Sequence, residues 1–330
     1  MTPLIETQGL IKHFPVNKGP FARLMTRKPR VVHAVDDVSF TINKGDVLGL
    51  AGESGCGKTT TGRLVLRLME PTAGKVLYKG DSLYGLGREE MRRLRAKMQI
   101  IFQDPFASLS PRMNIGQSIG HPLSIHTVLS KAEVTDRVHA IMEKVGLSPA
   151  DFLARKYPHQ ISGGQRQRVV IARALVTHPE FVVADEPIAM ADVSVRAMIL
   201  ELMVELKEAF DLTYLFITHD LATAKYICDR IAIMYLGQIL EVGSLAEVFR
   251  NPVHPYTDSL LAAVPVPDPK FRRTRPIPKG EIPNSIDPPE GCRFHPRCDY
   301  AVAECARLAP RMTRVSDDHF VACPVRHPER

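Results

Sequence analysis

The segment Gly52-Glu53-Ser54-Gly55-Cys56-Gly57-Lys58-Thr59 fits the pattern G-x-x-x-x-G-K-[ST]. An apolar run from Val47 to Ala51 precedes it, and a helical pattern follows from Lys58 to Met69. Strand, glycine-rich loop and helix in this order are the context that a phosphate-binding loop needs. Glycines let backbone N–H groups point at phosphate oxygens, and the helix N-terminus adds positive potential. The segment therefore predicts that Lys58 reaches the β- and γ-phosphates of a nucleotide and that Thr59 offers its hydroxyl to Mg²⁺. An accidental glycine-rich turn is the weaker alternative.

The composition is that of an ordinary folded protein. The chain has 330 residues, 45% hydrophobic and 24% charged, and no apolar run approaches the ~20 residues that span a bilayer. The N-terminus has no signal-peptide pattern, so we expect a cytoplasmic protein. The net charge is +7, and basic residues form clusters that suit either an anionic partner or plain solvated loops: Arg23, Arg27, Lys28, Arg30; Arg92, Arg93, Arg95, Lys97; Lys270, Arg272, Arg273, Arg275. Aromatic residues do not alternate regularly with the basic residues of these clusters and Trp is absent, which argues against a nucleic-acid platform.

Apolar strand patterns alternate with helical patterns along most of the chain. The predicted strands include Val38–Ile42, Val47–Ala51, Met98–Phe102, Phe181–Ala184, Tyr214–Ile217 and Ile231–Tyr235, whereas the stretch from Asn114 to about His178 has a helical pattern. This alternation predicts an α/β fold with a largely parallel sheet, interrupted by a helical subdomain. Eight of the 26 prolines lie between Pro265 and Pro289, which predicts an extended connector to a small cysteine-bearing tail.

Two further motifs are compatible with nucleotide chemistry. Asp185 and Glu186 follow the apolar strand, where one carboxylate can hold Mg²⁺ and the other can orient or deprotonate a water. The alternative is a helix cap, which we would favour without the phosphate loop. Ser162-Gly163-Gly164-Gln165 precedes a helical run and can form a second anion-binding nest, although by itself it is better explained as an N-cap.

Taken together, these residues resemble the ATP-binding cassette (ABC) ATPases, whose motifs occur here in the family's order: phosphate loop 52–59, Gln103, Ser162–Gln165, Asp185-Glu186, Asp192 and His219. The resemblance implies a RecA-like P-loop NTPase core with an antiparallel β subdomain and a helical subdomain. It also implies that two cassettes sandwich two ATP molecules. The catalytic residues would be Glu186, His219, Lys58 and Gln103, and Thr59, Gln103 and Asp185 would bind Mg²⁺. ATP would contact Phe14, which stacks on adenine, and Gly52, Ser54, Gly55, Cys56, Gly57, Lys58, Thr59, Thr60, Gln103, Asp185 and His219. The opposite subunit's ATP would contact Ser162, Gly163, Gly164, Gln165 and Asp192.

One position departs from the family pattern. The loop after Glu186 usually contains Ser-Ala-Leu-Asp, whereas this chain has Ala189-Met190-Ala191-Asp192. The aspartate is kept, but the hydroxyl is missing, which puts communication between subunits through this loop in doubt. Because cassette pairs can be asymmetric, a weak second ATP site is an open alternative.

Three segments resemble the oligopeptide and dipeptide importers within this family. They are Phe102 to Arg112 (FQDPFASLSPR), His254-Pro255-Tyr256-Thr257 followed by Val264-Pro265, and Gly291-Cys292-Arg293-Phe294-His295-Pro296-Arg297-Cys298. The resemblance implies a nucleotide-binding domain at 1–250, with its helical subdomain at about 105–178, and a C-terminal extension at 251–330. It implies a peripheral subunit on the cytoplasmic face of the inner membrane. Its partners would be a second ABC ATPase subunit, identical or homologous, two transmembrane permease subunits and an extracytoplasmic solute-binding protein. Nickel and other small-solute importers share this branch, so they remain an alternative cargo class.

Four of the six cysteines lie in the last 39 residues, with the spacing C-x5-C-x6-C-x17-C: Cys292, Cys298, Cys305 and Cys323. A cytosolic protein rarely uses disulfides, so the cluster suggests a metal. The spacing fits neither the paired cysteines of zinc sites nor the ferredoxin patterns. The resemblance to peptide-importer ATPases favours a [4Fe-4S] cluster, with zinc and free thiols as alternatives.

The leading hypothesis is thus the ATP-hydrolysing subunit of a peptide importer, with ATP, Mg²⁺ and a [4Fe-4S] cluster as cofactors and no nucleic acid as partner. A soluble ABC ATPase acting on nucleic acid or ribosomes is the second hypothesis. That class usually carries tandem cassettes or a long coiled-coil insertion, and this chain has neither. An iron–sulfur redox or sensing protein in which ATP is secondary is the third hypothesis.

Overall fold

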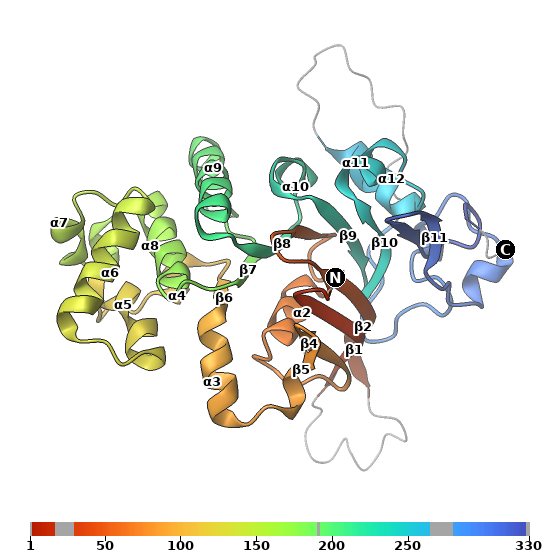
Figure 1. Cartoon of the computed structure of the whole chain (residues 1–330). Coiled ribbons are helices and arrows are strands. Elements are labelled where there is room, and N and C mark those ends of the chain that lie inside the picture. The colour runs from red at the N-terminus through yellow and green to blue at the C-terminus, as the bar shows by residue number, and fades with distance from the viewer. Residues whose placement is uncertain (1, 17–29, 190–191, 265–279, 328–330) are drawn as a thin grey trace. The chain divides into compact units, whose positions relative to one another are not determined.

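The computed structural model describes residues 2–16, 30–189, 192–264 and 280–327, apart from the side chain of Val193. The chain forms two compact units, one of Met1–Ile42, Leu48–Tyr84 and Thr218–Arg330, and one of Asn43–Val47 and Gly85–Ile217 (Figure 1). Several predicted features lie outside the described residues: most of the proposed connector, Met190 and Ala191, and the basic residues Arg23, Arg27, Lys28, Lys270, Arg272, Arg273 and Arg275.

The first unit contains an antiparallel four-stranded sheet of order β2-β1-β4-β5, which confirms the predicted antiparallel β subdomain. Its strands are β1 (Ile5–Pro15), β2 (Val31–Ile42), β4 (Ala73–Tyr78) and β5 (Asp81–Ser82). Side chains alternate between the two faces of a strand, and Val38, Phe40 and Ile42 of β2 are all buried, as their spacing predicts. The structure begins β2 seven residues earlier than the predicted strand because Val31 to Val35 pair with β1.

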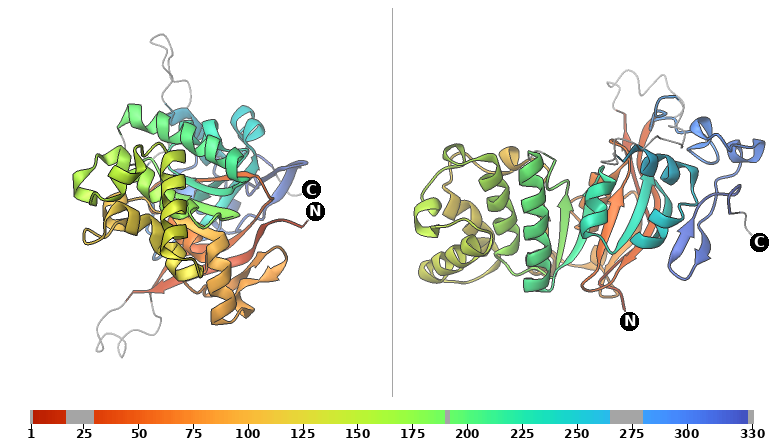
Figure 2. Two further views of the ribbon diagram at one scale, coloured as in Figure 1. Left: turned by 60° about the vertical axis from the view of Figure 1, so that its left-hand side comes forward. Right: turned by 90° about the horizontal axis from the view of Figure 1, so that it is seen from above.

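Five further strands, which belong almost entirely to this unit, support the phosphate loop. Among them β3 (Val47–Ala51) lies parallel to β9 (Arg230–Tyr235), followed by antiparallel β10 (Gln238–Ser244), β12 (His319–Val321) and β11 (Thr313–Ser316). The last two strands come from the C-terminal tail and form the edge of the sheet (Figure 2). The helical elements of the unit are α2 (Lys58–Val65), α10 (Leu221–Ile227), α11 (Leu245–Arg250), α12 (Pro255–Ala263) and the short 3-10 turns η1 (Leu83–Gly85), η3 (His295–Arg297) and η4 (Ala303–Ala306).

Helix α2 is shorter than its apolar pattern predicts, because it ends at Val65 and not at Met69. Arg67 adopts a left-handed conformation with φ 47°, and its N–H donates to the carbonyl of Leu64 at 2.9 Å. The N–H of Leu68 donates to the carbonyl of Arg63 at 2.8 Å. These two bonds form a Schellman C-cap, which usually requires glycine at the left-handed position. The Arg67 guanidinium compensates here by bonding to the carbonyl of Leu83 at 2.6 Å, a contact that local sequence does not reveal.

The second unit has three parallel strands in the order β8-β7-β6, namely β8 (Thr213–Thr218, whose last residue belongs to the first unit), β7 (Phe181–Asp185) and β6 (Met98–Ile101). Its helices are α3 (Arg88–Lys97), α4 (Pro105–Ser108), α5 (Ile115–His126), α6 (Lys131–Lys144), α7 (Ala150–Ala154), η2 (Pro158–Gln160), α8 (Gly163–Leu175) and α9 (Val193–Phe210). Helices α5 to α8 form one compact group, which confirms the helical pattern predicted between residues 114 and 178 (Figures 1 and 2).

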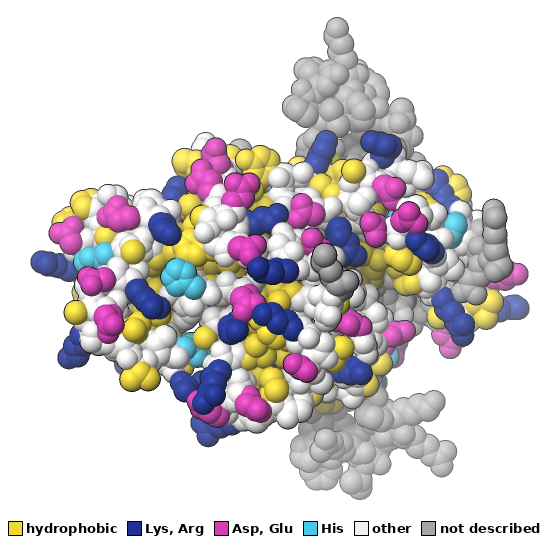
Figure 3. Space-filling model, in the orientation of Figure 1, with side chains coloured by type: hydrophobic (Ala, Val, Ile, Leu, Met, Phe, Trp, Pro, Cys, Tyr) yellow, Lys and Arg dark blue, Asp and Glu magenta, His cyan; other side chains and the backbone are white. Residues whose placement is uncertain are grey.

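The strands that carry site residues lie in the core. Every residue of β3 and β7 is buried, so the loops that follow them begin from fixed positions. Side chains of both signs are interspersed on the face of the molecule in Figure 3, and no continuous basic stripe is visible there. Within the described residues, no helix combines the length and the apolar character that crossing a bilayer requires.

Candidate functional site

The phosphate loop of residues 52–57 has the backbone shape that its glycines predict. Gly52 and Gly57 have φ 156° and 109°, in the region that favours glycine. A Cβ atom on Gly52 would lie 2.1 Å from the carbonyl oxygen of Met234, and one on Gly57 would lie 2.0 Å from that of Ala34. Both positions therefore require glycine for space as well as for conformation.

Lys58 spans the loop from the first residue of α2. Its Nζ donates to the carbonyl oxygens of Gly52 at 2.8 Å and Glu53 at 3.0 Å, and only 5% of the residue is exposed. The ammonium group thus lies against the backbone carbonyls of the loop, and a phosphate oxygen bound by the loop can accept its hydrogen bonds. Burial raises the pKa of the neighbouring Cys56 thiol, which keeps it neutral and agrees with a structural role.

Two other predicted ATP contacts belong to the same unit as the loop. Phe14, near the end of β1, is 36% exposed, as a ring that stacks on a ligand must be. His219 is exposed in the turn between β8 and α10. Hydrogen bonds of its neighbours fix that turn, since the N–H of Asp220 donates to Thr218 Oγ1 at 3.0 Å and the Asp220 carboxylate accepts from Ala222 N–H at 2.9 Å.

The predicted acids lie at the carboxyl end of β7 in the second unit. Asp185 is buried at 4% exposure, and Glu186 follows with φ 45°, an uncommon value for a residue with a side chain. The Glu186 N–H donates to the carbonyl of Ile217 at 3.0 Å, which holds this conformation. Gln103, just after β6, donates from Nε2 to Glu186 Oε2 at 3.0 Å. The structure therefore brings two of the predicted catalytic residues into direct contact.

Ser162 forms the N-cap of α8. The Gln165 N–H donates to Ser162 Oγ at 3.2 Å, and the Ser162 N–H donates to Gln165 Oε1 at 3.0 Å. This capping box is the arrangement expected if Ser162 serves as a helix N-cap. It also leaves Ser162 and Gly163 exposed at the helix end. Asp192 is exposed as the N-cap residue of α9, and Ala189 donates its N–H to the carbonyl of Glu186 at 3.1 Å. The predicted contact of these residues with a second subunit's ATP stays a prediction.

The four tail cysteines converge although they are far apart in sequence. Cys292, Cys305 and Cys323 are buried, Cys298 is half-buried, and the Cys292 N–H donates to the carbonyl of Cys305 at 2.8 Å. Burial first, and then the other three thiols, raise the pKa of Cys292 to about 11. Thiolates around one zinc ion lie about 3.8 Å apart. Among the described residues, however, the only group of three or more such ligands within 4.8 Å of one another is His13, His33 and Asp36.

Sequence reasoning missed the contacts that join the C-terminal extension to the phosphate loop. Arg297 forms an ion pair with Glu53 of the loop, and the N–H of Glu53 donates to the buried Tyr256 hydroxyl at 3.0 Å. Arg293 bonds to Asp36 on β2. In the sequence the two tail motifs that contain these residues mark a branch of the family. The available signal was the pair of arginines, Arg293 and Arg297, between two cysteines, but their burial and their partners appear only in the structure.

Comparison with known proteins agrees with this architecture. The ABC transporter profile matches residues 35–189, and the profile described as the oligopeptide/dipeptide transporter C-terminal region matches residues 240–305. The dipeptide transport ATP-binding protein DppF of Haemophilus influenzae is 47% identical over 322 residues, covering 98% of this chain and 96% of its own. The oligopeptide transport ATP-binding protein AppF of Bacillus subtilis is 45% identical over 323 residues, covering 97% of this chain and 96% of its own.

Solved structures of cassettes have the same fold. The dimeric ATP-binding cassette MJ0796, in a post-hydrolysis state with ADP and Pi, is similar with a TM-score of 0.63 and 26% identity, over 73% of this chain and 98% of that one. The cassette CbiO1 of Clostridium perfringens, part of the ABC transporter complex CbiONQ, gives the same TM-score and identity over 76% and 92% of the two chains. The predicted RecA-like α/β fold is thereby confirmed.

Proposed function

Because this chain belongs to the ABC transporter family, in its oligopeptide/dipeptide branch, we propose that it is the ATP-hydrolysing subunit that energises import of di- or oligopeptides through a membrane transporter. The full-length similarity to DppF and AppF, which extends through the C-terminal region, is the observation that carries this proposal. The geometry of the phosphate loop supports nucleotide binding, since Lys58 already lies within it.

For catalysis, we assign Glu186 as the residue that orients or deprotonates the attacking water, and His219 as the contact to the γ-phosphate. The hydrogen bond from Gln103 supports this role for Glu186, because it orients the carboxylate. Thr59, Gln103 and Asp185 offer the hard oxygen donors that Mg²⁺ prefers, and the bound ion would neutralise charge on the triphosphate. Phosphoryl transfer needs positioning and charge neutralisation more than covalent help, which this set of residues can supply.

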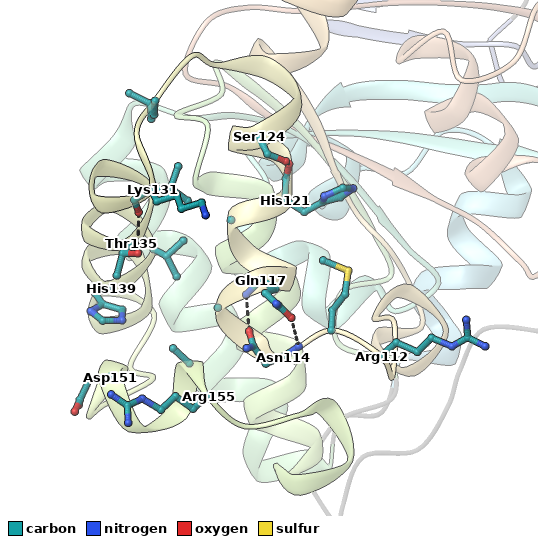
Figure 4. A pocket seen from close by; sticks show the side chains of 17 residues that line it. Arg112, Asn114, Gln117, His121, Ser124, Lys131, Thr135, His139, Asp151 and Arg155 are labelled. Atoms are coloured by element: carbon teal, nitrogen blue, oxygen red, sulfur yellow. Dashed lines mark hydrogen bonds between the residues drawn. The ribbon is translucent and has the colours of Figure 1, made fainter.

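We further propose that two cassettes pair around ATP and dock on two permease subunits at the cytoplasmic face of the membrane, with a solute-binding protein delivering peptide. A groove of about 920 Å³ in the helical subdomain supports a docking role (Figure 4). Asn114 and Gln117, which line it, exchange hydrogen bonds of 2.8 and 3.0 Å. Arg112, Lys131 and Arg155 also line it, together with a single acidic residue, Asp151, so it suits a helix with polar or acidic side chains.

We propose that the four tail cysteines bind a [4Fe-4S] cluster, with zinc and free thiols as the alternatives. The Arg326 N–H donates to Cys323 Sγ at 3.5 Å, and hydrogen bonds to cysteine sulfurs help to set the reduction potential of such a cluster. The four thiolates would hold the cluster, which would link three buried positions and the half-buried Cys298 of the tail.

A soluble ABC ATPase acting on nucleic acid remains the runner-up, and a nickel importer is the alternative within the same branch. The match to the oligopeptide/dipeptide C-terminal region favours the importer.

Peptide uptake in cells that depend on this subunit tests the proposal. Lys58→Ala should abolish uptake of labelled di- or tripeptides, while Lys225→Ala, which removes an exposed lysine of α10, should leave it intact. Uptake that survives in the Lys58→Ala cells, or a purified complex that contains nucleic acid and no permease, would contradict the proposed function.

A further inference from the structure

The strongest contact between the C-terminal extension and the phosphate loop is a bidentate ion pair. Arg297 Nη1 lies 2.8 Å from Glu53 Oε2, and Nη2 lies 3.1 Å from Oε1. The side chain of Arg297 is only 7% exposed, and its guanidinium lies 5.7 and 5.9 Å from the ring centres of Tyr235 and Phe294. A planar guanidinium that is stacked on rings and bonded through two nitrogens is fixed in both position and direction.

Glu53 links this ion pair to the nucleotide-binding lysine. Its N–H donates to Tyr256, which is fully buried, and its carbonyl oxygen accepts from Lys58 Nζ at 3.0 Å and from the Cys56 N–H at 3.3 Å. One residue of the loop is therefore held from the outside by the extension and contacts Lys58 on the inside. A displacement of Glu53 moves the carbonyl oxygen that helps to place the ammonium group.

A second arginine of the extension fixes the neighbouring wall. Arg293, 6% exposed, bonds to the carbonyl of Leu236 and to the carboxylate of Asp36. The adjacent Gly237 N–H donates to the carbonyl of Cys56 in the phosphate loop at 2.8 Å. Because Arg293 already neutralises Asp36, we explain the proximity of this aspartate to His13 and His33 as part of the same packing and not as a metal site.

The extension also walls a cavity beside the loop. The cavity has a volume of about 280 Å³ and is lined by residues 53–56 of the loop, by Tyr235 and Leu236, and by residues 282–285 of the extension. The carbonyl of Ser285 accepts the His33 N–H at 2.8 Å, so the segment is attached to β2. The extension and the phosphate loop thus line the same cavity.

The charge of Glu53 explains why an arginine is needed there. A carboxylate inside a phosphate-binding loop repels a triphosphate, and an unpaired one lowers nucleotide affinity through space. We propose that Arg297 is a positioning residue of the ATP site that acts through Glu53: it cancels the charge of that carboxylate, so that the phosphate loop accepts the triphosphate. The inference rests on nucleotide binding at residues 52–59 and is independent of the transported cargo.

Nucleotide affinity of the purified full-length protein tests this. The dissociation constants of MgADP and of a magnesium complex of a non-hydrolysable ATP analogue are measured by calorimetry for wild type, Arg297→Ala, Glu53→Gln and the double variant. We expect Arg297→Ala to raise the dissociation constant about tenfold, equivalent to about 1.4 kcal/mol, and more for the triphosphate than for the diphosphate. The double variant should recover to within about threefold of wild type, because the uncompensated charge is gone. Arg307→Ala, an exposed arginine of the same extension, is the matched control and should have no effect.

Each contrary result is distinct. The proposal is overturned if folded Arg297→Ala has an unchanged dissociation constant, or if the double variant binds as weakly as Arg297→Ala. The second result would mean that Arg297 has a purely structural role, because removing the Glu53 charge would not restore affinity. Should Arg297→Ala fail to fold, Glu53→Gln alone decides: we expect affinity equal to or tighter than wild type, and a tenfold loss refutes the idea. If wild type binds the nucleotides no more tightly than Lys58→Ala, nucleotide binding at residues 52–59 is contradicted. That result would count against the proposed function and is distinct from a failure of the Arg297 proposal.

Discussion

Replacing His254 with Asn should remove an acid-sensitive contribution to the stability of the first unit. His254 is 1% exposed, and its Nδ1 accepts the Tyr256 N–H at 3.0 Å as the N-cap of α12. Burial lowers the pKa of His254 to about 4, although Glu241 opposes this and Arg326 adds to it. The imidazole therefore stays neutral in the folded protein at pH values where the unfolded chain already binds a proton.

The size of the effect follows from the two pKa values. In the unfolded chain the histidine has a pKa of about 6.5, so proton uptake stabilises the unfolded state below that pH. The folded state takes up this proton only when the pH approaches 4. Integrating the difference in bound protons between the unfolded and folded states over pH gives the effect. The free energy of unfolding falls by about 2 kcal/mol at pH 5 and about 3 kcal/mol at pH 4, relative to pH 7.5. The loss levels off below the folded pKa, because both states are then protonated.

Chemical denaturation between pH 7.5 and 4 measures this directly. Asparagine keeps an N-cap acceptor for α12 and has no titratable group, so His254→Asn is the matched reference. The free energy of unfolding of wild type minus that of His254→Asn should fall by about 2 kcal/mol between pH 7.5 and 5. If the two proteins instead lose stability in parallel across this range, the reasoning from burial is wrong.

Three further outcomes are expected. Glu186→Gln should retain ATP binding and lose a factor of ~10²–10⁴ in phosphate release by the assembled transporter, and near-normal release would remove Glu186 from its role. Gly57→Ala should abolish nucleotide binding, because its Cβ would lie 2.0 Å from the carbonyl of Ala34, whereas Gly85→Ala, with nothing within 4 Å, should bind normally; equal affinity of the two variants would contradict the steric argument. Protein purified without oxygen should contain iron and absorb visible light, and Cys292→Ser should lose most of both; wild type free of iron would refute the cluster.

The features that could be predicted from sequence are those set by neighbours along the chain. The strand, loop and helix around Lys58 follow from apolar runs and glycines within some 20 residues, and the buried strand before Asp185 follows from its own composition. The contact of Arg297 with Glu53 joins residues 244 positions apart, and no local pattern encodes which acid an arginine will meet. The end of α2 was mispredicted for a similar reason, since the support of Arg67 comes from another element.

Strands β11 and β12 have a consequence for what happens when the chain is cut. They cover the outer side of β10, and His319 of β12 lies 2.7 Å from Glu241, which is fully buried. A proteolytic product that ends before residue 313 would present the bare edge of β10, a template for adding strands from other molecules. It would also remove the imidazole that contacts Glu241, whose carboxylate accepts hydrogen bonds from the N–H groups of Val253 and His254 as well. Truncated copies should therefore aggregate rather than compete with intact subunits for their places in the transporter.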